Sequence, residues 1–172
     1  MSHSTETIRH EAERMLKAAG VTGAPISLRD VVNHLNLSLV ERRREPFGSE
    51  AALVARGDGH AIELRGSSGE RRLRFTIAHE IGHFLLHPGR AMSERGGATN
   101  QSTARLEREA DQFAAELLMP EHLVRQAVLD DGADVRRLAD RFDVSTKAMS
   151  LRLRHLGLVE RHRGIARPPR GA

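Results

Sequence analysis

The 172-residue sequence predicts an α+β fold, because segments with helical and with strand periodicity follow one another in separate blocks. Two helical segments come first, three short strands follow, and helical segments fill most of the rest. Apolar residues make up 39% of the chain and charged residues 29%, which is enough apolar material for a core. The length fits one domain with a small appendage.

The first half of the sequence contains the first two predicted helices and all the predicted strands. Apolar spacing predicts helices over residues 6–19 and 25–35, the second with Ser27 as N-cap. The alternating segment 37–41 predicts a strand, and residues 51–56 and 60–65 predict a hairpin around Gly57-Asp58-Gly59. We expect polar turns at residues 42–50 and 66–70.

The second half is helical. The apolar pattern predicts a long buried helix over residues 72–87, a polar mobile loop over 89–103 and a helix over 104–119 that Pro120 stops. A short helix over 121–129 and a helical pair over 134–158 follow. The basic, proline-containing end of the chain predicts disorder.

Composition excludes several classes of protein. The chain has no cysteine, so disulfides, thiol catalysis and cysteine-bound zinc are excluded. It has no run of eighteen apolar residues and no visible secretory signal, so we expect a cytoplasmic protein without a membrane partner. Aromatic residues are only 3%, which argues against a base-stacking RNA platform.

Positive charge is concentrated at the end of the sequence. Residues 134–172 hold 10 basic and 4 acidic side chains, whereas residues 1–133 hold 17 basic and 19 acidic ones. The asymmetry indicates an acidic partner or nucleic acid at the C-terminal end. Solubility together with an arginine-rich genome is the alternative explanation.

The most informative motif is HEIGH at residues 79–83. Residues four apart lie on one face of a helix, so the imidazoles of His79 and His83 can reach one metal ion at about 2.0–2.1 Å. Glu80 lies beside them, where it can accept a proton from a water that the metal activates. The motif therefore suggests a catalytic metal site.

The surroundings of the motif favour this interpretation. Apolar residues flank it on both sides, and unpartnered histidines and a glutamate in a buried helix would be costly. Gly82 is a poor helix former, and we explain it as room for close approach by a neighbouring element. A pair of hydrogen-bonded core histidines without metal is the alternative.

The third metal ligand is expected in EREAD, residues 107–111. Glu107 and Asp111 share a helix face, which suits one carboxylate on the metal and one on the second ring nitrogen of a ligand histidine. We expect Glu107 to be the ligand, with Glu109 as the main rival. His87 is left out of the site, because a helix-terminal histidine more often caps carbonyl groups. Two histidines and a glutamate favour Zn²⁺ over manganese or iron.

This ligand set predicts peptide-bond hydrolysis. The metal would lower the pKa of its water toward neutrality, Glu80 would accept the proton, and the hydroxide would attack a peptide carbonyl. Glu80 would then deliver the proton to the leaving amine. We expect the substrate to lie extended along the edge of the small sheet, beside residues 60–65.

RFTIAHEIGHFLLH followed by EREADQFAAELLMP closely resembles the ImmA/IrrE family of metallo-endopeptidases, over roughly residues 5–128. The resemblance implies a minimal zincin-like core, with zinc on His79, His83 and Glu107 and with Glu80 as the base. It also implies a regulatory protease whose protein substrate is a helix-turn-helix transcriptional repressor. We therefore expect a metallopeptidase domain over residues 1–130, a helix-turn-helix-like subdomain over 131–160 and a disordered basic tail over 161–172.

The helical pair at residues 134–158 has the pattern of a helix-turn-helix, with Ser145 capping its second helix. Met149, Leu153 and Leu156 supply the buried side of that helix. The polar residues Thr146, Lys147, Ser150, Arg152 and Arg154 are expected to face outward. Outward arginines would suit DNA phosphates, and substrate docking or plain packing are the alternatives.

Three functions compete at this stage. The leading one is a zinc endopeptidase that acts on one or few protein substrates. The second is a DNA-binding transcriptional regulator with a non-catalytic metal site, and the third is a partner protein in a toxin–antitoxin or mobile-element system. Three protein ligands with one open position favour catalysis, because structural zinc sites usually have four protein ligands.

Overall fold

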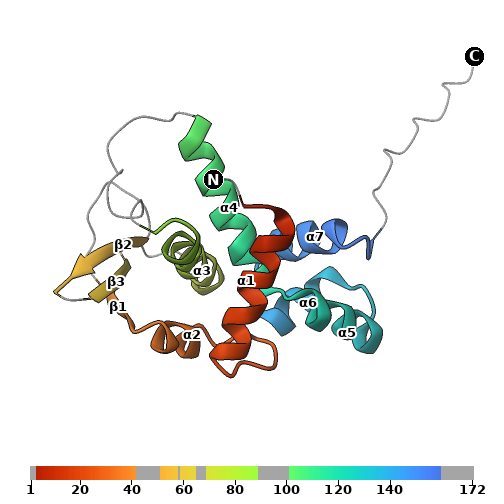
Figure 1. Ribbon diagram of the computed structural model, residues 1–172. Helices are drawn as coiled ribbons and strands as arrows, with labels where there is room; N and C mark the ends of the chain where they lie inside the picture. Colours follow the sequence, from red (N-terminus) through yellow and green to blue (C-terminus); the bar gives the residue numbers. More distant parts are fainter. Residues whose placement is uncertain (1–2, 42–50, 58, 65–68, 89–100, 160–172) are drawn as a thin grey trace, which may run out of the picture.

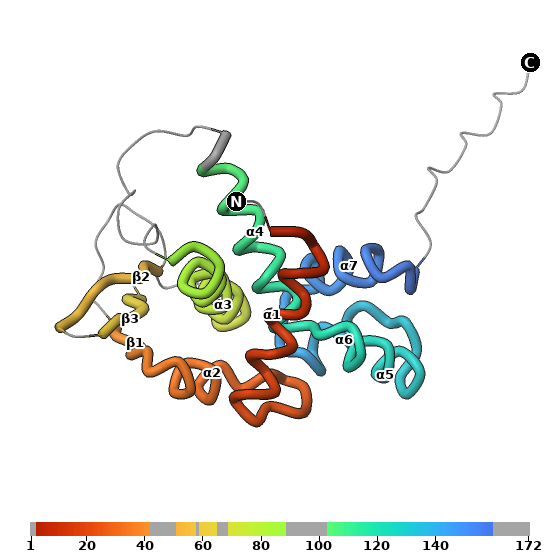
Figure 2. Tube along the Cα trace, viewed as in Figure 1, coloured from red at the N-terminus to blue at the C-terminus, as the bar shows by residue number. Residues whose placement is uncertain are grey.

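The computed structural model describes residues 3–41, 51–57, 59–64, 69–88 and 101–159 (Figures 1 and 2). Within them the predicted α+β class is confirmed. The elements in order are α1 Thr5–Ala18, α2 Leu28–His34, β1 Leu37–Glu41, β2 Ala51–Arg56, β3 Gly59–Leu64, α3 Glu70–Leu86, α4 Gln101–Leu118, α5 Glu121–Asp131, α6 Val135–Phe142 and α7 Thr146–His155. No helix in this part of the chain is both long and apolar enough to cross a bilayer.

The helix ends differ from the predictions by a few residues, for local reasons. Helix α2 begins at Leu28 rather than at residue 25, because the Ser27 side chain caps it from an extended backbone conformation. Helix α3 begins two residues earlier than expected, after Gly69, and α4 begins at Gln101 instead of residue 104. The turn at 42–50, most of the turn at 66–70, most of the loop at 89–103 and the tail at 161–172 lie outside the described residues.

The sheet has three strands in the order β1-β3-β2. Strand β2 pairs antiparallel with β3, as the hairpin pattern predicts, and β1 joins the other side of β3 in parallel, with Leu37 opposite His60. Strand β3 is therefore central. The expectation that substrate lies on a sheet edge beside residues 60–65 is wrong, because β1 and β2 already use both sides of that strand.

Helix α3 lies between the sheet and α4, and α1 packs across α4 on the far side (Figure 1). A Cβ atom on Gly82 would lie 3.2 Å from the Cα and carbonyl oxygen of Ala110 and 3.2 Å from the Cβ of Phe113. The prediction that Gly82 makes room for a neighbouring element is thus confirmed. The close approach brings side chains of α3 and α4 within reach of each other.

The C-terminal pair α6–α7 shares the core of the rest of the chain. Leu138, Phe142 and Met149 belong to the same buried cluster as the residues of α1, α3 and α4. On the opposite side of the pair, Arg71 of α3 binds Asp140 at 2.7 Å. The pair is therefore attached to the two central helices by apolar and charged contacts.

Arg152 corrects the predicted outward face of α7. Its side chain is buried, with two guanidinium nitrogens on the Glu116 carboxylate and Nε donating to the carbonyl oxygen of Met119 at 2.8 Å. An amphipathic pattern assigns an arginine to the solvent side, but Glu116 of α4 neutralises the charge inside the protein. Lys147 and Arg154 are exposed, as predicted.

Candidate metal centre

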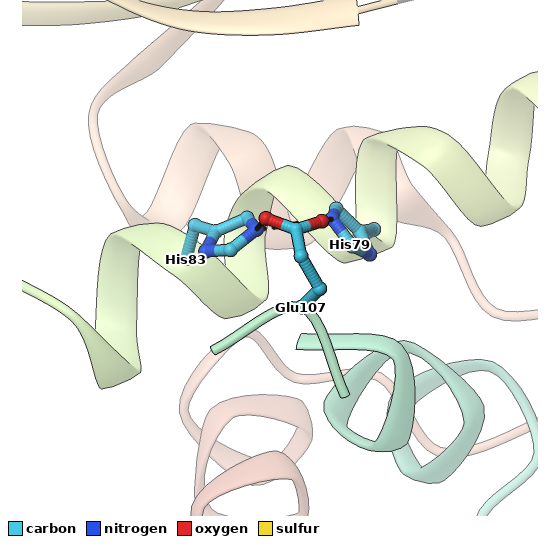
Figure 3. Close-up of side chains that lie close together, drawn as sticks. All are labelled: His79, His83 and Glu107. Carbon is cyan, nitrogen blue, oxygen red and sulfur yellow. Dashed lines mark hydrogen bonds and ion pairs between the residues drawn. The ribbon is translucent and has the colours of Figure 1, made fainter. Parts of the chain in front are cut away.

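His79, His83 and Glu107 come together between α3 and α4 (Figure 3). Among the described residues they form a group whose ligand atoms all lie within 4.8 Å of one another. The two Nε2 atoms are 3.0 Å apart, one Glu107 oxygen lies 3.3 Å from Nε2 of His79, and the other lies 3.2 Å from Nε2 of His83. The structure thus brings together the three ligands that the sequence predicted.

These distances fit one divalent cation. Ligands at about 2.0–2.1 Å from a tetrahedral zinc ion are about 3.3 Å apart. The two imidazoles and the carboxylate are a nitrogen and oxygen donor set that zinc prefers. Their side chains are 16%, 14% and 53% exposed, so the group opens to solvent on the side of Glu107. His79, His83 and Glu107 could therefore hold a metal ion and leave a position open.

Asp111 fixes the ring of His79 from behind. Its Oδ1 lies 2.8 Å from Nδ1 of His79, on the other side of the ring from Nε2. An ionised carboxylate can only accept, so Nδ1 carries the hydrogen, and in the neutral ring Nε2 has a lone pair for a metal ion. Burial lowers the pKa of His79, but the hydrogen bond and the charge of Asp111, with the charge of Glu107, outweigh it and raise the pKa.

Glu80 lies on the sheet side of α3. It is buried, and its Oε2 accepts a hydrogen bond of 3.0 Å from the amide nitrogen of Leu53 in β2. The Leu53 amide is therefore turned toward α3 rather than into the ladder with β3. Strand β2 thus turns the edge that does not pair with β3 toward the helix that carries His79 and His83, with Glu80 between them.

Glu109, the rival ligand, does not face the group. It is buried, and its Oε2 lies 3.1 Å from Nε2 of His87. Glu107 and Glu109 are two residues apart, so they point to different sides of α4. The structure therefore favours Glu107 as the carboxylate ligand.

His87 is the residue that sequence reasoning missed. It is the C-cap residue of α3, and its backbone amide donates to the carbonyl oxygen of His83 at 3.0 Å. Its ring has a different use: Nδ1 lies 3.1 Å from Nδ1 of His83, and Nε2 contacts Glu109. Burial lowers the pKa of His87, and the hydrogen bond with Glu109 offsets this only in part. The available signal was its spacing, since His87 follows His83 by one helical turn.

The comparisons with known proteins agree with this geometry. The model of the IrrE N-terminal-like domain, peptidase family M78, matches residues 34–154, so the chain belongs to this metallopeptidase family. The expected ImmA/IrrE membership is thereby confirmed. No curated protein matches the chain.

A solved structure shares the fold. The chain is similar to a Mycobacterium tuberculosis transcriptional regulator with a TM-score of 0.64 and 17% sequence identity. The match covers 85% of this chain and 55% of that one, so the chain spans about half the length of that structure. At this identity the likeness concerns the fold.

Proposed function

We propose that the protein is a zinc-dependent endopeptidase of regulatory type, which cleaves a protein substrate such as a helix-turn-helix transcriptional repressor. The observation that carries the proposal is the position of Glu107 on α4. Its carboxylate lies against Nε2 of His79 and Nε2 of His83, the two histidines of the HEIGH motif. Membership of a metallopeptidase family and the fold likeness to a protein named as a transcriptional regulator support it.

The metal, when bound, would polarise the peptide carbonyl and make the attacking water more acidic. His79, His83 and Glu107 would hold it, and Asp111 would orient the ring of His79. Glu80 would take the proton of the attacking water and return it to the leaving amine. The Leu53 amide holds the Glu80 carboxylate on the sheet side of the site.

We place the substrate backbone at the edge of β2 that does not pair with β3. Leu53 and Ile62 are paired across the hairpin, and the Leu53 amide points away from β3. By the alternation of an antiparallel ladder, the backbone groups of Ala55 point the same way. Ala55 is exposed, so an extended peptide can add to β2 there and cross the ligand group.

A comparison of wild type with Glu80→Gln tests the proposal. The zinc-loaded proteins are incubated with any helix-turn-helix repressor that is encoded beside the gene and with a library of proteome-derived peptides. We expect wild type to cut at defined bonds, and Glu80→Gln to bind the same substrate with at least about a hundredfold slower cleavage. Binding without cleavage by both proteins would reject the enzyme and favour a partner protein.

DNA contact through residues 134–158 is a second candidate function. The exposed Lys147 and Arg154 on α7 favour it, whereas the burial of Arg152 removes one predicted phosphate contact. If α7 binds DNA, the binding constant should fall steeply as the salt concentration rises. Lys147→Ala should reduce the slope of log binding constant against log salt concentration by about one. Absence of binding at low salt would reject this function.

A further inference from the structure

A second chain of contacts leads away from the candidate metal centre and into the protein. It runs from Nδ1 of His83 to Nδ1 of His87 at 3.1 Å, and from Nε2 of His87 to Oε2 of Glu109 at 3.1 Å. The side chains of His87 and Glu109 are 4% and 7% exposed. Water therefore has little access to these contacts, and the side chains must satisfy each other.

The direction of the hydrogen bonds follows from the chemistry of the groups. An ionised Glu109 can only accept, so Nε2 of His87 carries a hydrogen. In a neutral His87 the other nitrogen, Nδ1, is then an acceptor. The facing Nδ1 of His83 can then supply the hydrogen, which leaves Nε2 of His83 as a lone pair for a metal ion. Without a metal, Glu107 at 3.2 Å and Nε2 of His79 at 3.0 Å act in the opposite direction, because both accept a hydrogen from Nε2 of His83.

We propose that His87 and Glu109 are positioning residues that hold His83 as its Nδ1–H tautomer. They would do for His83, through two hydrogen bonds, what Asp111 does for His79 through one. The expected consequence of this positioning is a higher affinity for the metal, and that part of the inference rests on the proposed function. The tautomer of the metal-free protein, in which His87 and Glu109 act against Glu107 and His79, is tested separately.

The surroundings of His87 fit this role. The His3 ring lies 6.1 Å from the His87 ring, and Nε2 of His3 contacts the carbonyl oxygen of Leu86 at 3.0 Å. Glu109 also has Arg105 within 3.4 Å of its other oxygen. The His87 ring thus has neighbours on several sides, which limits its rotation and keeps Nδ1 directed at His83.

The test uses two substitutions of His87, one that removes its hydrogen-bonding groups and one that keeps them. His87→Phe keeps the ring volume and removes both hydrogen bonds. His87→Gln keeps one acceptor and one donor about as far apart as the two ring nitrogens. His122→Phe makes the same change on the exposed side of α5 and is the matched control.

Two measurements are made on each protein. Long-range proton–nitrogen correlation spectra of the metal-free chain report the His83 tautomer, with the signal assigned from His83→Gln. Zinc dissociation constants come from competition with a chromophoric chelator. If His87→Phe does not fold in chelator, as judged by circular dichroism, His87→Phe/Glu109→Leu replaces it, because it removes the buried Glu109 charge together with its His87 partner.

We expect the Nδ1–H tautomer of His83 in wild type and in His87→Gln, and its loss in His87→Phe. Zinc affinity should fall about 10–100-fold in His87→Phe and recover most of this in His87→Gln. An Nε2–H tautomer in wild type, an unchanged tautomer and affinity in His87→Phe, or equal losses in both variants would overturn the inference. A wild type that binds no zinc would reject the proposed function, while the tautomer would still decide the positioning role.

Discussion

Gly82 of α3 and Ala110 of α4 are in backbone contact: a Cβ atom on Gly82 would lie 3.2 Å from both the Cα and the carbonyl oxygen of Ala110. This contact sets the separation of the two helices that carry the candidate metal ligands. Ala110 lies three residues after Glu107, and Gly82 precedes His83 directly. The distance between α3 and α4 therefore decides whether the candidate ligands come within reach of one metal ion.

Gly82→Val should weaken metal binding by separating the helices. The added side chain cannot fit against Ala110 without a shift of α4, and overpacking of this kind costs about 1–3 kcal/mol. We expect a lower melting temperature of the metal-free protein and a zinc affinity reduced at least tenfold. Ala104→Val, on an exposed position of α4, is the control and should change neither. Wild-type affinity in Gly82→Val would show that the helix spacing does not set the site.

Glu107 and Asp111 should differ in how strongly they affect metal binding. Glu107→Ala removes a ligand and should abolish tight zinc binding, whereas Asp111→Ala removes only the partner of His79 and should cost about 10–100-fold. Calorimetric titration of the metal-free proteins with zinc measures both. The reverse order of the two effects would make Asp111 the ligand.

Ala55→Pro should reduce cleavage without unfolding the sheet. By the alternation of the ladder the Ala55 amide faces the edge of β2 away from β3, so proline removes the proposed hydrogen bond to the substrate and none of the ladder. We expect kcat/KM to fall about tenfold, corresponding to one hydrogen bond of about 1–1.5 kcal/mol. Ala55→Val keeps the amide and should cleave like wild type. Equal rates for the proline and valine variants would place the substrate elsewhere.

Arg152 should matter far more for stability than its neighbour Arg154. Arg152→Met leaves Glu116 buried and unpaired, which costs about 3–5 kcal/mol, whereas Arg154 is exposed and its replacement should stay within about 0.5 kcal/mol. Urea unfolding measures the free energy of each variant. The double variant Arg152→Met/Glu116→Met should recover most of the loss, and its failure to do so would contradict this assignment.

The N-cap of α6 should give an acid-sensitive contribution to stability. The backbone amide of Arg137, followed by that of Arg136, lowers the pKa of Asp134 below 3.8. A carboxylate whose pKa is lower in the folded than in the unfolded state stabilises the protein at pH values above the unfolded-state pKa. This stabilisation is lost as the pH falls through the folded-state pKa. The difference in unfolding free energy between wild type and Asp134→Ser should therefore narrow from pH 5 downward, since serine caps without charge. A difference that does not change with pH would contradict this.

Local features were predictable from the sequence. The strand Leu37–Glu41, the N-caps Ser27 and Ser145 and the stop at Pro120 depend on a few neighbouring residues, and the structure has all of them. Two of the three candidate ligands were equally accessible, because helical spacing places His79 and His83 on one face. Glu107 comes from another helix and was predicted from the EREAD segment and the family resemblance.

Features that depend on pairing between distant segments were not predictable. Nothing in the hairpin sequence shows that β1 joins β3 in parallel and makes β3 the central strand. Arg152 looks like a surface residue until Glu116, from another helix, is seen beside it. His87 ends α3 as expected, but the buried contact of its ring was not predictable because its partner Glu109 comes from another helix, after the predicted loop at residues 89–103.

The proposed hydrolysis depends on one divalent metal ion held between α3 and α4. Equilibrium dialysis of the metal-free protein against micromolar zinc tests this most directly. We predict about one zinc per chain for wild type and essentially none for Glu107→Ala, since two histidines alone do not make a tight site. No zinc on the folded wild type, or equal zinc on Glu107→Ala, would contradict the account.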